Sequence, residues 1–297
     1  MPNPNNHAGG HYALDVDGSP VESLKAVSGL DIGGDVVLQA PGPDLVRKKQ
    51  IAHIRWSPGK ATIGIGMGKG MYEWMKKAFD HGASTSHGTL AVGDFNFRKR
   101  SVLTFTDALL TSVTVPRLDT ASKDAGEFEI EFEPGDVRVD KGDGSDIGGV
   151  VGKKQQPWLS SDFRFQLGSL PCARVASIDA FTWTCTPTAG TLFQPDSVAT
   201  VKVPNLRLSI SAADYDAWAQ AAHRWFIDGH HLDGDEMDGL ITLLAPDLQA
   251  PLGAIALSSV GFLRFAQLPP PGGDTLTRFV VDLYVEKMSL RILRYEG

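Results

Sequence analysis

The sequence predicts a mainly β protein with two short helices, arranged as two tandem copies of one fold. Short segments of alternating apolar and polar residues, a pattern typical of half-buried strands, recur between turns along the chain. Their order then repeats. The layout from Tyr12 to Leu30 returns from Phe163 to Trp183, 151 positions later. A chain of 297 residues is long enough to hold two such domains.

Composition narrows the class of protein. A net charge of −7 and a pI near 5.6 argue against a nucleic-acid binder, which normally carries a basic face. No apolar run approaches the roughly 20 residues of a membrane helix. Residues 1–11 are polar and lack the pattern of a signal peptide, so they are expected to be a flexible lead. We therefore expect synthesis in the cytoplasm and no membrane insertion.

The first copy, residues 12–139, opens with an expected β-hairpin. Tyr12, Leu14 and Val16 alternate with polar or small residues, as in a strand with one buried face. The sequence Asp-Gly-Ser-Pro that follows favours a tight turn, because glycine accepts a positive φ and proline fixes its own. Val21 to Leu30 is then expected to return as the second strand.

A long Gly- and Pro-rich excursion, Asp31 to Pro58, comes next. It contains the basic cluster Arg47, Lys48 and Lys49. Connections of this length inside a compact domain tend to be functional or disordered. Two interpretations remain open: a solvated surface loop, or an arm that reaches a neighbouring subunit.

A helix is expected from Met71 to His81, after a strand from Ala61 to Met67. Its apolar side chains recur every three or four residues, and Gly82 is a suitable C-terminal stop. This helix should place its apolar stripe, which includes Trp74, on a sheet.

Three further strands are expected at Gly88–Arg98, Ser101–Leu118 and Glu127–Glu133. The last, EFEIEFE, places three apolar residues on one face and four glutamates on the other. Its acidic face must meet water, a cationic partner or a water-filled channel. Candidate assembly contacts are the three basic residues of the excursion and three of these glutamates: Arg47, Lys48, Lys49, Glu127, Glu129 and Glu131.

The second copy, residues 157–297, follows an expected linker at 140–156 and repeats the element order. A strand at Leu206–Ile210 leads into a helix at Ala212–Ile227, with Ser211 as N-cap and Asp214 in a capping-box relation. Strands are expected at Gly239–Leu244, Ile255–Leu268 and Arg278–Glu286. Trp218 matches Trp74 at an offset of 144, and the last strand matches EFEIEFE at 151. A change of loop length explains the seven-residue slip.

Two segments resemble binding motifs without meeting their requirements. Gly64–Gly70 lacks the first glycine and the final Ser or Thr of a phosphate loop, which favours a strand-to-helix turn. The cluster His223–Asp238 has metal-ligand residue types, but Met237 and Asp238 occupy positions where a calcium loop needs an oxygen ligand and a glycine. A solvated loop is the favoured interpretation.

No residues predict catalysis. The sequence has no GxSxG or HExxH motif, and Cys172 and Cys185 lack the spacing of a metal site. These two cysteines could face each other across a hairpin, but buried thiols are the favoured interpretation. We therefore expect no enzyme activity, no cofactor and no metal.

Each copy resembles the tail-tube protein family of contractile phages and phage-derived injection systems. In the first copy the resemblance rests on HYALDVDGSPVESLKAVSGLDI, on ATIGIGMGKGMYEWMKKAF and on the closing strands, with Val27–Leu30, Trp74 and Pro116 at fitting positions. It covers most of Tyr12–Val139 and, more faintly, Phe163–Ile292. The second copy departs from the pattern, since it lacks the Ser-Gly-Leu and has a shorter loop before its helix.

The resemblance implies a β-barrel-like sandwich flanked by one helix in each copy. Family members form six-membered rings whose sheets join edge to edge, and the rings stack into a tube. Two fused copies would then make a trimeric, pseudo-six-fold ring of the tube or of the tube-to-spike junction at the baseplate. Its partners would be the tube, sheath, baseplate or spike proteins of the assembled particle. The alternative is a two-domain β module that binds a peptide or sugar without catalysis.

Overall fold

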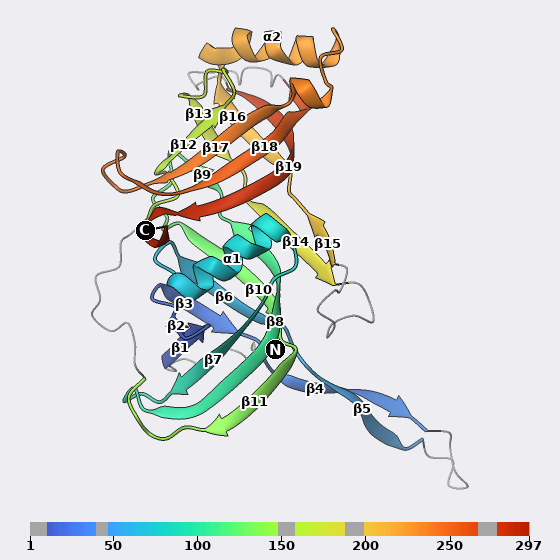
Figure 1. The fold of residues 1–297 in the computed structure, drawn as a ribbon, viewed down its shortest axis with the longest axis vertical. Helices are drawn as coiled ribbons and strands as arrows, with labels where there is room; N and C mark the ends of the chain where they lie inside the picture. Colours follow the sequence, from blue (N-terminus) through green and yellow to red (C-terminus); the bar gives the residue numbers. More distant parts are fainter. Residues whose placement is uncertain (1–10, 40–46, 148–157, 188–198, 267–277, 297) are drawn as a thin grey trace.

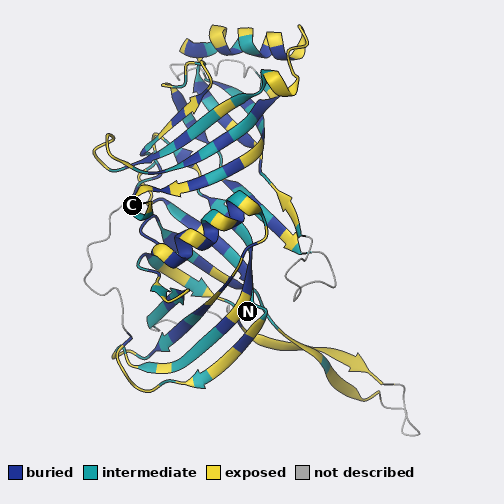
Figure 2. Ribbon diagram, in the orientation of Figure 1, coloured by how far each residue is buried: buried dark blue, intermediate teal, exposed yellow. Residues whose placement is uncertain are grey.

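The computed structural model describes residues 11–39, 47–147, 158–187, 199–266 and 278–296. In this part of the chain the protein is mainly β with two α-helices, as the sequence predicts (Figure 1). Its strands form a ten-stranded sheet, a seven-stranded sheet and a separate two-stranded hairpin. Buried residues line the facing sides of the sheets and helices, whereas the separate hairpin is exposed along its length (Figure 2).

The first sheet is built mainly from the N-terminal half, in the order β2-β1-β7-β8-β10-β6-β3, with β11 also on β8. Its strands from this half are β1 (His11–Val16), β2 (Ser19–Pro20), β3 (Leu24–Ser28), β6 (Gly59–Gly64), β7 (Thr85–Gly93), β8 (Lys99–Val115), β10 (Glu127–Glu133) and β11 (Asp136–Lys141).

The expected opening hairpin is wrong beyond its first residues. β1 pairs with β2 only at Asp15 and Val16, and the Val21 amide then donates to the Leu14 carbonyl at 2.8 Å. After this bond the chain leaves β1, and β3 pairs with β6 at the other end of the sheet. β1 and β3 therefore lie toward opposite ends of one curled sheet and are not partners.

Helix α1 (Lys69–His81) follows the prediction closely. Its apolar stripe is buried, and the Trp74 indole N–H donates to the Ser84 carbonyl at 2.9 Å. Gly82 ends the helix at φ 89°, a conformation that favours glycine. The strand before it, β6, ends at Gly64, and Gly68 at φ 87° begins the helix. The Gly-rich segment is thus a strand-to-helix turn.

The second sheet has the order β12-β17-β18-β19-β16-β13-β9. Its strands are β12 (Phe163–Leu167), β13 (Val175–Ile178), β16 (Leu206–Ser211), β17 (Met237–Leu244), β18 (Pro251–Ala266) and β19 (Arg278–Ile292), with β9 (Leu118–Asp119) from the N-terminal half. Here too the first two strands, β12 and β13, are not hairpin partners. β19 is one long strand, where the first half has the two strands β10 and β11.

Helix α2 (Tyr215–Phe226) follows a single 3-10 turn at Ala212–Asp214. Ser211 caps this turn by accepting from the Ala213 amide, but the expected capping box does not form. The Ser211 amide instead donates to the Arg174 carbonyl at 3.1 Å, and Asp214 accepts from the Arg174 guanidinium at 2.7 Å. Arg174 therefore binds both partners of the expected bond between the Ser211 amide and the Asp214 carboxylate.

The halves share their element order and several unusual backbone conformations. β1, β3, β6, α1, β7 and β8 correspond in order to β12, β13, β16, α2, β17 and β18. Three residues with positive φ in the first half have counterparts of nearly equal φ, 151 or 152 positions on. These pairs are Asp17 (49°) and Gly168 (49°), Phe97 (58°) and Leu248 (57°), and Asp107 (49°) and Ser259 (53°).

The expected linker, residues 140–156, begins as part of the first sheet. Asp140 and Lys141 end β11, the Ser145 carbonyl accepts from Lys99 at 2.9 Å, and the Ile147 amide donates to Phe97 at 2.8 Å. Residues 148–156 lie outside the described part of the chain.

Candidate assembly interface

The two halves are joined by a hairpin that crosses from one sheet to the other. β14 (Phe181–Pro187) and β15 (Ala199–Lys202) come from the C-terminal half, yet they extend the first sheet. β14 runs antiparallel to the end of β8, with Phe181 opposite Val115 and Thr184 opposite Ser112. In Figure 1 this hairpin descends from the second sheet to lie beside β8. One half thus donates strands to the sheet of the other.

Side chains close this strand pairing on both faces. Trp183 is only 1% exposed and stacks on Phe79 of α1, with ring centroids 5.5 Å apart and planes at 21°. On the other face the hydroxyls of Thr114 and Thr182 share a hydrogen bond of 2.9 Å. Burial of a side chain as large as Trp183 makes this a well-packed joint and not a surface contact.

A hairpin of the first half has no such partner strand among the described residues. β4 (Ile32–Leu38) and β5 (Lys49–Trp56) pair only with each other and project from the body as an arm (Figure 1). The arm is covered with exposed apolar side chains. They are Ile32 (62% exposed), Val36 (58%), Val37 (47%), Leu38 (50%), Ile51 (73%) and Ile54 (69%). In its described residues the excursion is therefore a projecting β-hairpin and not a plain loop.

The second sheet has an open edge where the first sheet receives β14. β17 pairs with β18 only as far as Val260, so the stretch from Gly261 to Ala266 has β19 on one side and no described strand on the other. β19 pairs with this stretch of β18 much as β10 pairs with the end of β8. The stretch therefore corresponds to the part of β8 that pairs with β14. Leu263 within it is 52% exposed. Unpaired edges of this kind are sites of strand addition.

A second contact between the halves lies on α1. The C-terminal residues fold onto this helix: the Gly68 amide donates to the Tyr295 hydroxyl at 2.7 Å, and the Tyr72 hydroxyl donates to the Glu296 carboxylate at 2.6 Å. Ser289 of β19 donates to Asp80 at 2.6 Å.

The Tyr72–Glu296 pair is reflected in two shifted pKa values. The hydrogen bond from Tyr72 holds the pKa of the Glu296 carboxyl below its usual value. Burial and the same bond raise the pKa of Tyr72. Both shifts favour the bonded, ionised carboxylate at neutral pH.

The acidic strand β10 lies in the first sheet with its glutamates on the solvent side. Glu129 is exposed, Glu127 and Glu131 are half-buried, and Glu131 forms an ion pair of 2.9 Å with Lys60 of β6. A shallow groove of about 480 Å³ runs along this face, lined by residues of β3, β6, β8 and β10. The sequence-predicted alternation is confirmed, since Phe128, Ile130 and Phe132 are buried.

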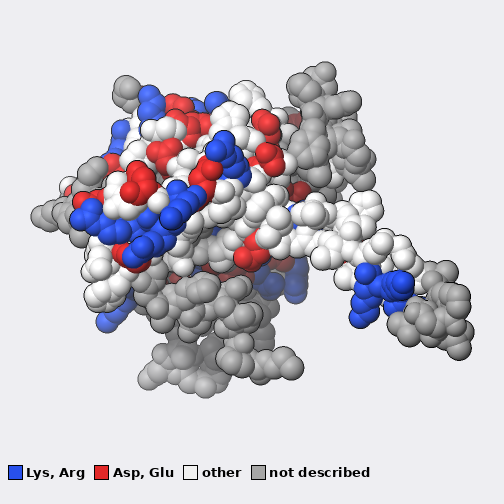
Figure 3. Space-filling model, turned by 90° about the horizontal axis from the view of Figure 1, so that it is seen from below, with Lys and Arg blue, Asp and Glu red and all other residues white. Residues whose placement is uncertain are grey.

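The predicted basic residues lie elsewhere. Arg47, Lys48 and Lys49 are exposed at the outer part of the arm, and Figure 3 shows Lys and Arg side chains gathered there. Within one chain they make no described ion pair with the glutamates of β10.

The remaining predicted features hold no described site. In the loop after α2, His230 lies 3.5 Å from Asp235 and His231 bonds the Trp225 carbonyl, but no cluster of metal-ligand side chains is found among the described residues. Cys172 and Cys185 are free thiols, and burial raises the pKa of Cys172 to about 11. Within the described ranges, no helix is long and apolar enough to span a membrane.

The comparisons with known proteins give partial structural matches. No family model and no curated protein matches the sequence. The anti-feeding prophage tube-terminating cap is similar over 44% of this chain and 87% of its own, with 20% identity and a TM-score of 0.38. A protein of the PVC sheath–tube complex in the extended state covers 44% and 88%, with 20% identity and a TM-score of 0.37.

A third solved structure, from the anti-feeding prophage baseplate, covers 50% of this chain and 99% of its own, with 11% identity and a TM-score of 0.37. Each of these proteins is a component of a contractile injection system or related particle, the same class that the sequence resembles. The likeness extends over about half of this chain and concerns the fold alone.

Proposed function

We propose that this chain is a structural, non-enzymatic component of a contractile injection particle or phage tail. Three chains form a closed ring in which the β4–β5 arm of one chain adds to the free β18 edge of the next. The observation that carries this proposal is the strand pairing of β14 with β8. This pairing forms, inside a single chain, the same kind of contact that is proposed between chains.

The proposal depends on the two halves being copies, residues 12–139 and 157–297. The shared element order and the three matched pairs of positive φ support a duplication. Positive φ at a residue other than glycine is uncommon, and five of these six residues are not glycine, so their recurrence at offsets of 151 or 152 is hard to obtain from unrelated folds. In this correspondence β4–β5 is the copy of β14–β15, and the end of β18 is the copy of the end of β8.

Ring closure follows from the number of free joints. Within each chain the β14–β15 hairpin pairs with the edge of β8. The β4–β5 arm and the edge of β18 then remain for pairing between chains. A molecule with one donor and one acceptor surface makes head-to-tail contacts, which close into a ring when the rotation permits. The family resemblance implies a ring of six domains, which three chains of two domains each would form. The ring would serve as part of the tube or as the tube-to-spike junction, contacting tube, sheath, baseplate or spike proteins.

The basic residues of the arm add an electrostatic component to this proposal. Arg47, Lys48 and Lys49 would meet acidic neighbours on another chain or ring, such as Glu127, Glu129 and Glu131. Reversing the charge of the three basic residues should weaken assembly at low salt more than at high salt, because exposed charges are screened. Assembly that is unchanged at both salt concentrations would remove this contact.

Engineered disulfides test the joint directly. By the offsets of the two halves, Asp31 and Ala266 of neighbouring chains correspond to Thr182 and Thr114 of one chain. A chain carrying Asp31→Cys and Ala266→Cys should form covalent dimers and trimers on oxidation. The matched control, Thr114→Cys with Thr182→Cys, should crosslink within the chain and stay at monomer mass, because its side chains already touch. Oxidation that gives only monomers in the test pair would sink the proposed joint.

Negative-stain microscopy tests the assembly itself. Rings with three-fold symmetry are expected from purified chain or from chain mixed with its particle partners. Single compact particles at every concentration and salt, with or without partners, would contradict the ring.

A further inference from the structure

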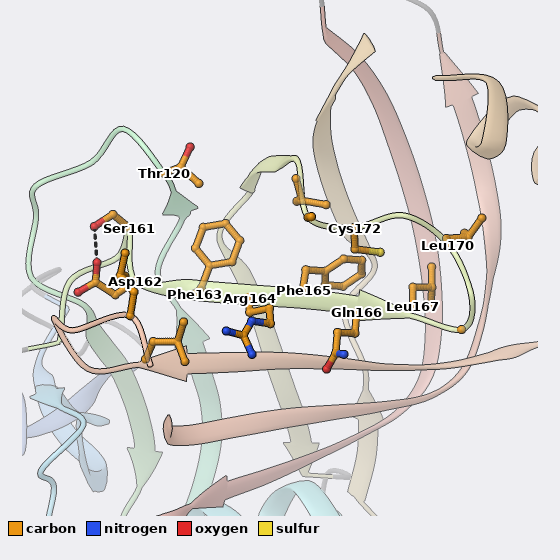
Figure 4. Close-up of a pocket in the computed structure, with 15 residues that line it drawn as sticks. Thr120, Ser161, Asp162, Phe163, Arg164, Phe165, Gln166, Leu167, Leu170 and Cys172 are labelled. Carbon is orange, nitrogen blue, oxygen red and sulfur yellow. Dashed lines mark hydrogen bonds between the residues drawn. The ribbon is translucent and has the colours of Figure 1, made fainter. Parts of the chain in front are cut away.

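The second sheet has a groove at its open seam, between edge strand β12 and the opposite edge at β13 and β9. It encloses about 660 Å³ and is lined from Thr120 and Ser161 to Cys172 and Val175 (Figure 4). Phe163 and Phe165 point to the seam side of β12, whereas Arg164 and Gln166 point to its other face (Figure 4). The groove is thus apolar along one wall and follows a strand edge.

Among the described residues, no strand pairs with β12 along this edge. Its bonds to β17 alternate, as in any antiparallel pair: the Leu244 amide donates to Asp162 at 2.8 Å, and the Gly168 amide donates to Asp238 at 2.9 Å. By this alternation the backbone amides and carbonyls that point toward β17 are those of Asp162, Arg164, Gln166 and Gly168. The amide and carbonyl of Phe165 therefore point into the groove.

The first half shows what covers the same edge. There the chain itself returns along β1: Ser19 and Pro20 pair with it, and the Val21 amide donates to the Leu14 carbonyl at 2.8 Å. In the second half the returning segment turns away, and its amides bond locally, from Leu170 to Leu167 and from Val175 to Cys172. The groove is the space left by that departure.

A carboxylate stands at one end of the groove. Asp162 is 6% exposed; its Oδ1 accepts from Ser161 Oγ at 2.9 Å, while its Oδ2 has no partner among the described residues. A buried carboxylate with an unpaired oxygen is costly unless a cation or donor completes it. An occupant with a basic side chain near this end would supply that charge.

We propose that this groove binds an extended peptide segment of a partner protein as an added strand antiparallel to β12. The segment has alternating apolar side chains, which pack against Phe165 and Cys172, and a Lys or Arg at the Asp162 end. Such strand addition takes its affinity from main-chain hydrogen bonds and its specificity from alternate side chains. This inference does not depend on the ring, since the β12 edge is distinct from the arm and from β18.

Binding of a defined peptide tests the proposal. The probe is a fluorescein-labelled KVTVTV peptide, titrated by anisotropy into the full-length chain. A version N-methylated at alternate residues cannot pair through its backbone and should bind about tenfold more weakly. Cys172→Trp, which fills the groove, should weaken the parent peptide to a similar degree. Asp216→Asn, an exposed change on α2, is the control and should leave binding unchanged.

The basic residue is tested by a double comparison. Replacing the peptide's Lys with norleucine should weaken binding several-fold to the natural chain and leave it unaltered for Asp162→Asn. Equal binding of the N-methylated and parent peptides, or no binding up to about 1 mM, would overturn the proposal. So would a loss of peptide binding as the chain concentration rises into the range in which the chain self-associates, because a second copy would then occupy the groove.

Discussion

Substituting Ile32 on the arm should separate assembly from folding. Ile32 is 62% exposed in the single chain, whereas its counterpart on β14, Trp183, is 1% exposed in the internal joint. If the arm adds to β18 of a neighbour, Ile32 becomes buried there. Ile32→Ser should then weaken the joint between chains and leave the chain's own stability nearly unchanged.

The size of the effect follows from the exposed fraction. Full burial of an isoleucine side chain contributes about 1.5–3 kcal/mol, and 62% of it is available to be buried, which gives about 1–2 kcal/mol for each joint. A change of about 1.4 kcal/mol alters an association constant tenfold. We therefore expect association between chains to weaken about 5- to 25-fold, and a ring with three joints to lose about 3–6 kcal/mol in total.

Sedimentation velocity over a concentration series measures association, and urea unfolding followed by circular dichroism measures stability. The control is Phe95→Ser, which removes a side chain that is 82% exposed at the tip of the β7–β8 hairpin, away from the arm and the β18 edge. It should change neither quantity. Unchanged association of Ile32→Ser, or equal weakening by Phe95→Ser, would refute the reasoning.

Three other predictions concern the chain by itself. Trp183→Ala should lower the free energy of unfolding by about 3–5 kcal/mol, since it empties a fully buried site against Phe79; a loss under 1 kcal/mol in urea would contradict the packed joint. Tyr72→Phe should cost about 1–3 kcal/mol at neutral pH. The folded pKa of Glu296 is lowered, so the stability contributed by this hydrogen bond is complete above the unfolded pKa of 4.5 and is lost as the pH falls through the folded pKa. The plots of unfolding free energy against pH for Tyr72→Phe and for the natural chain should therefore converge in acid. A difference between them that does not change with pH would contradict this role of the hydrogen bond. Gly88→Ala places a methyl group against the Asp15 carbonyl and the Phe105 ring and should cost about 1–3 kcal/mol by the same urea assay, whereas Gly18→Ala, which meets no atom within 4 Å, tests the cost of its positive φ alone.

Local patterns in the sequence predicted the elements that bury one face. The alternation of β10 gave its bounds, Glu127–Glu133, without error, and the stripe containing Trp74 gave α1 to within two residues. Both signals depend only on which residues are buried, and side-chain periodicity records that directly. Ser211 was a correct cap for the same local reason, although Arg174 displaced its capping box.

The pairing of strands was harder to predict from the sequence, because side-chain periodicity does not record which strand lies beside which. Nothing local distinguishes β3 beside β6 from β3 beside β1. The β14 strand was missed beyond Trp183, although Phe181, Trp183 and Cys185 alternate with threonines and would have predicted it. Its place on β8, 66 residues away along the chain at the Phe181–Val115 pair, is set by packing with Phe79. The pairing of β14 with β8 could therefore be identified only from the three-dimensional structure.

Two hairpins of this chain lie in different surroundings. β14 pairs with β8 and buries Trp183, whereas β4–β5 projects with six apolar side chains exposed. An isolated two-stranded hairpin is marginally stable in water, and an exposed apolar one invites association. Among its described residues, this chain pairs one hairpin internally and leaves the other hairpin and the end of β18 without a further strand partner. Its unsatisfied arm and edge have the donor and acceptor character of the satisfied pair, and joining them between chains would extend one sheet from subunit to subunit.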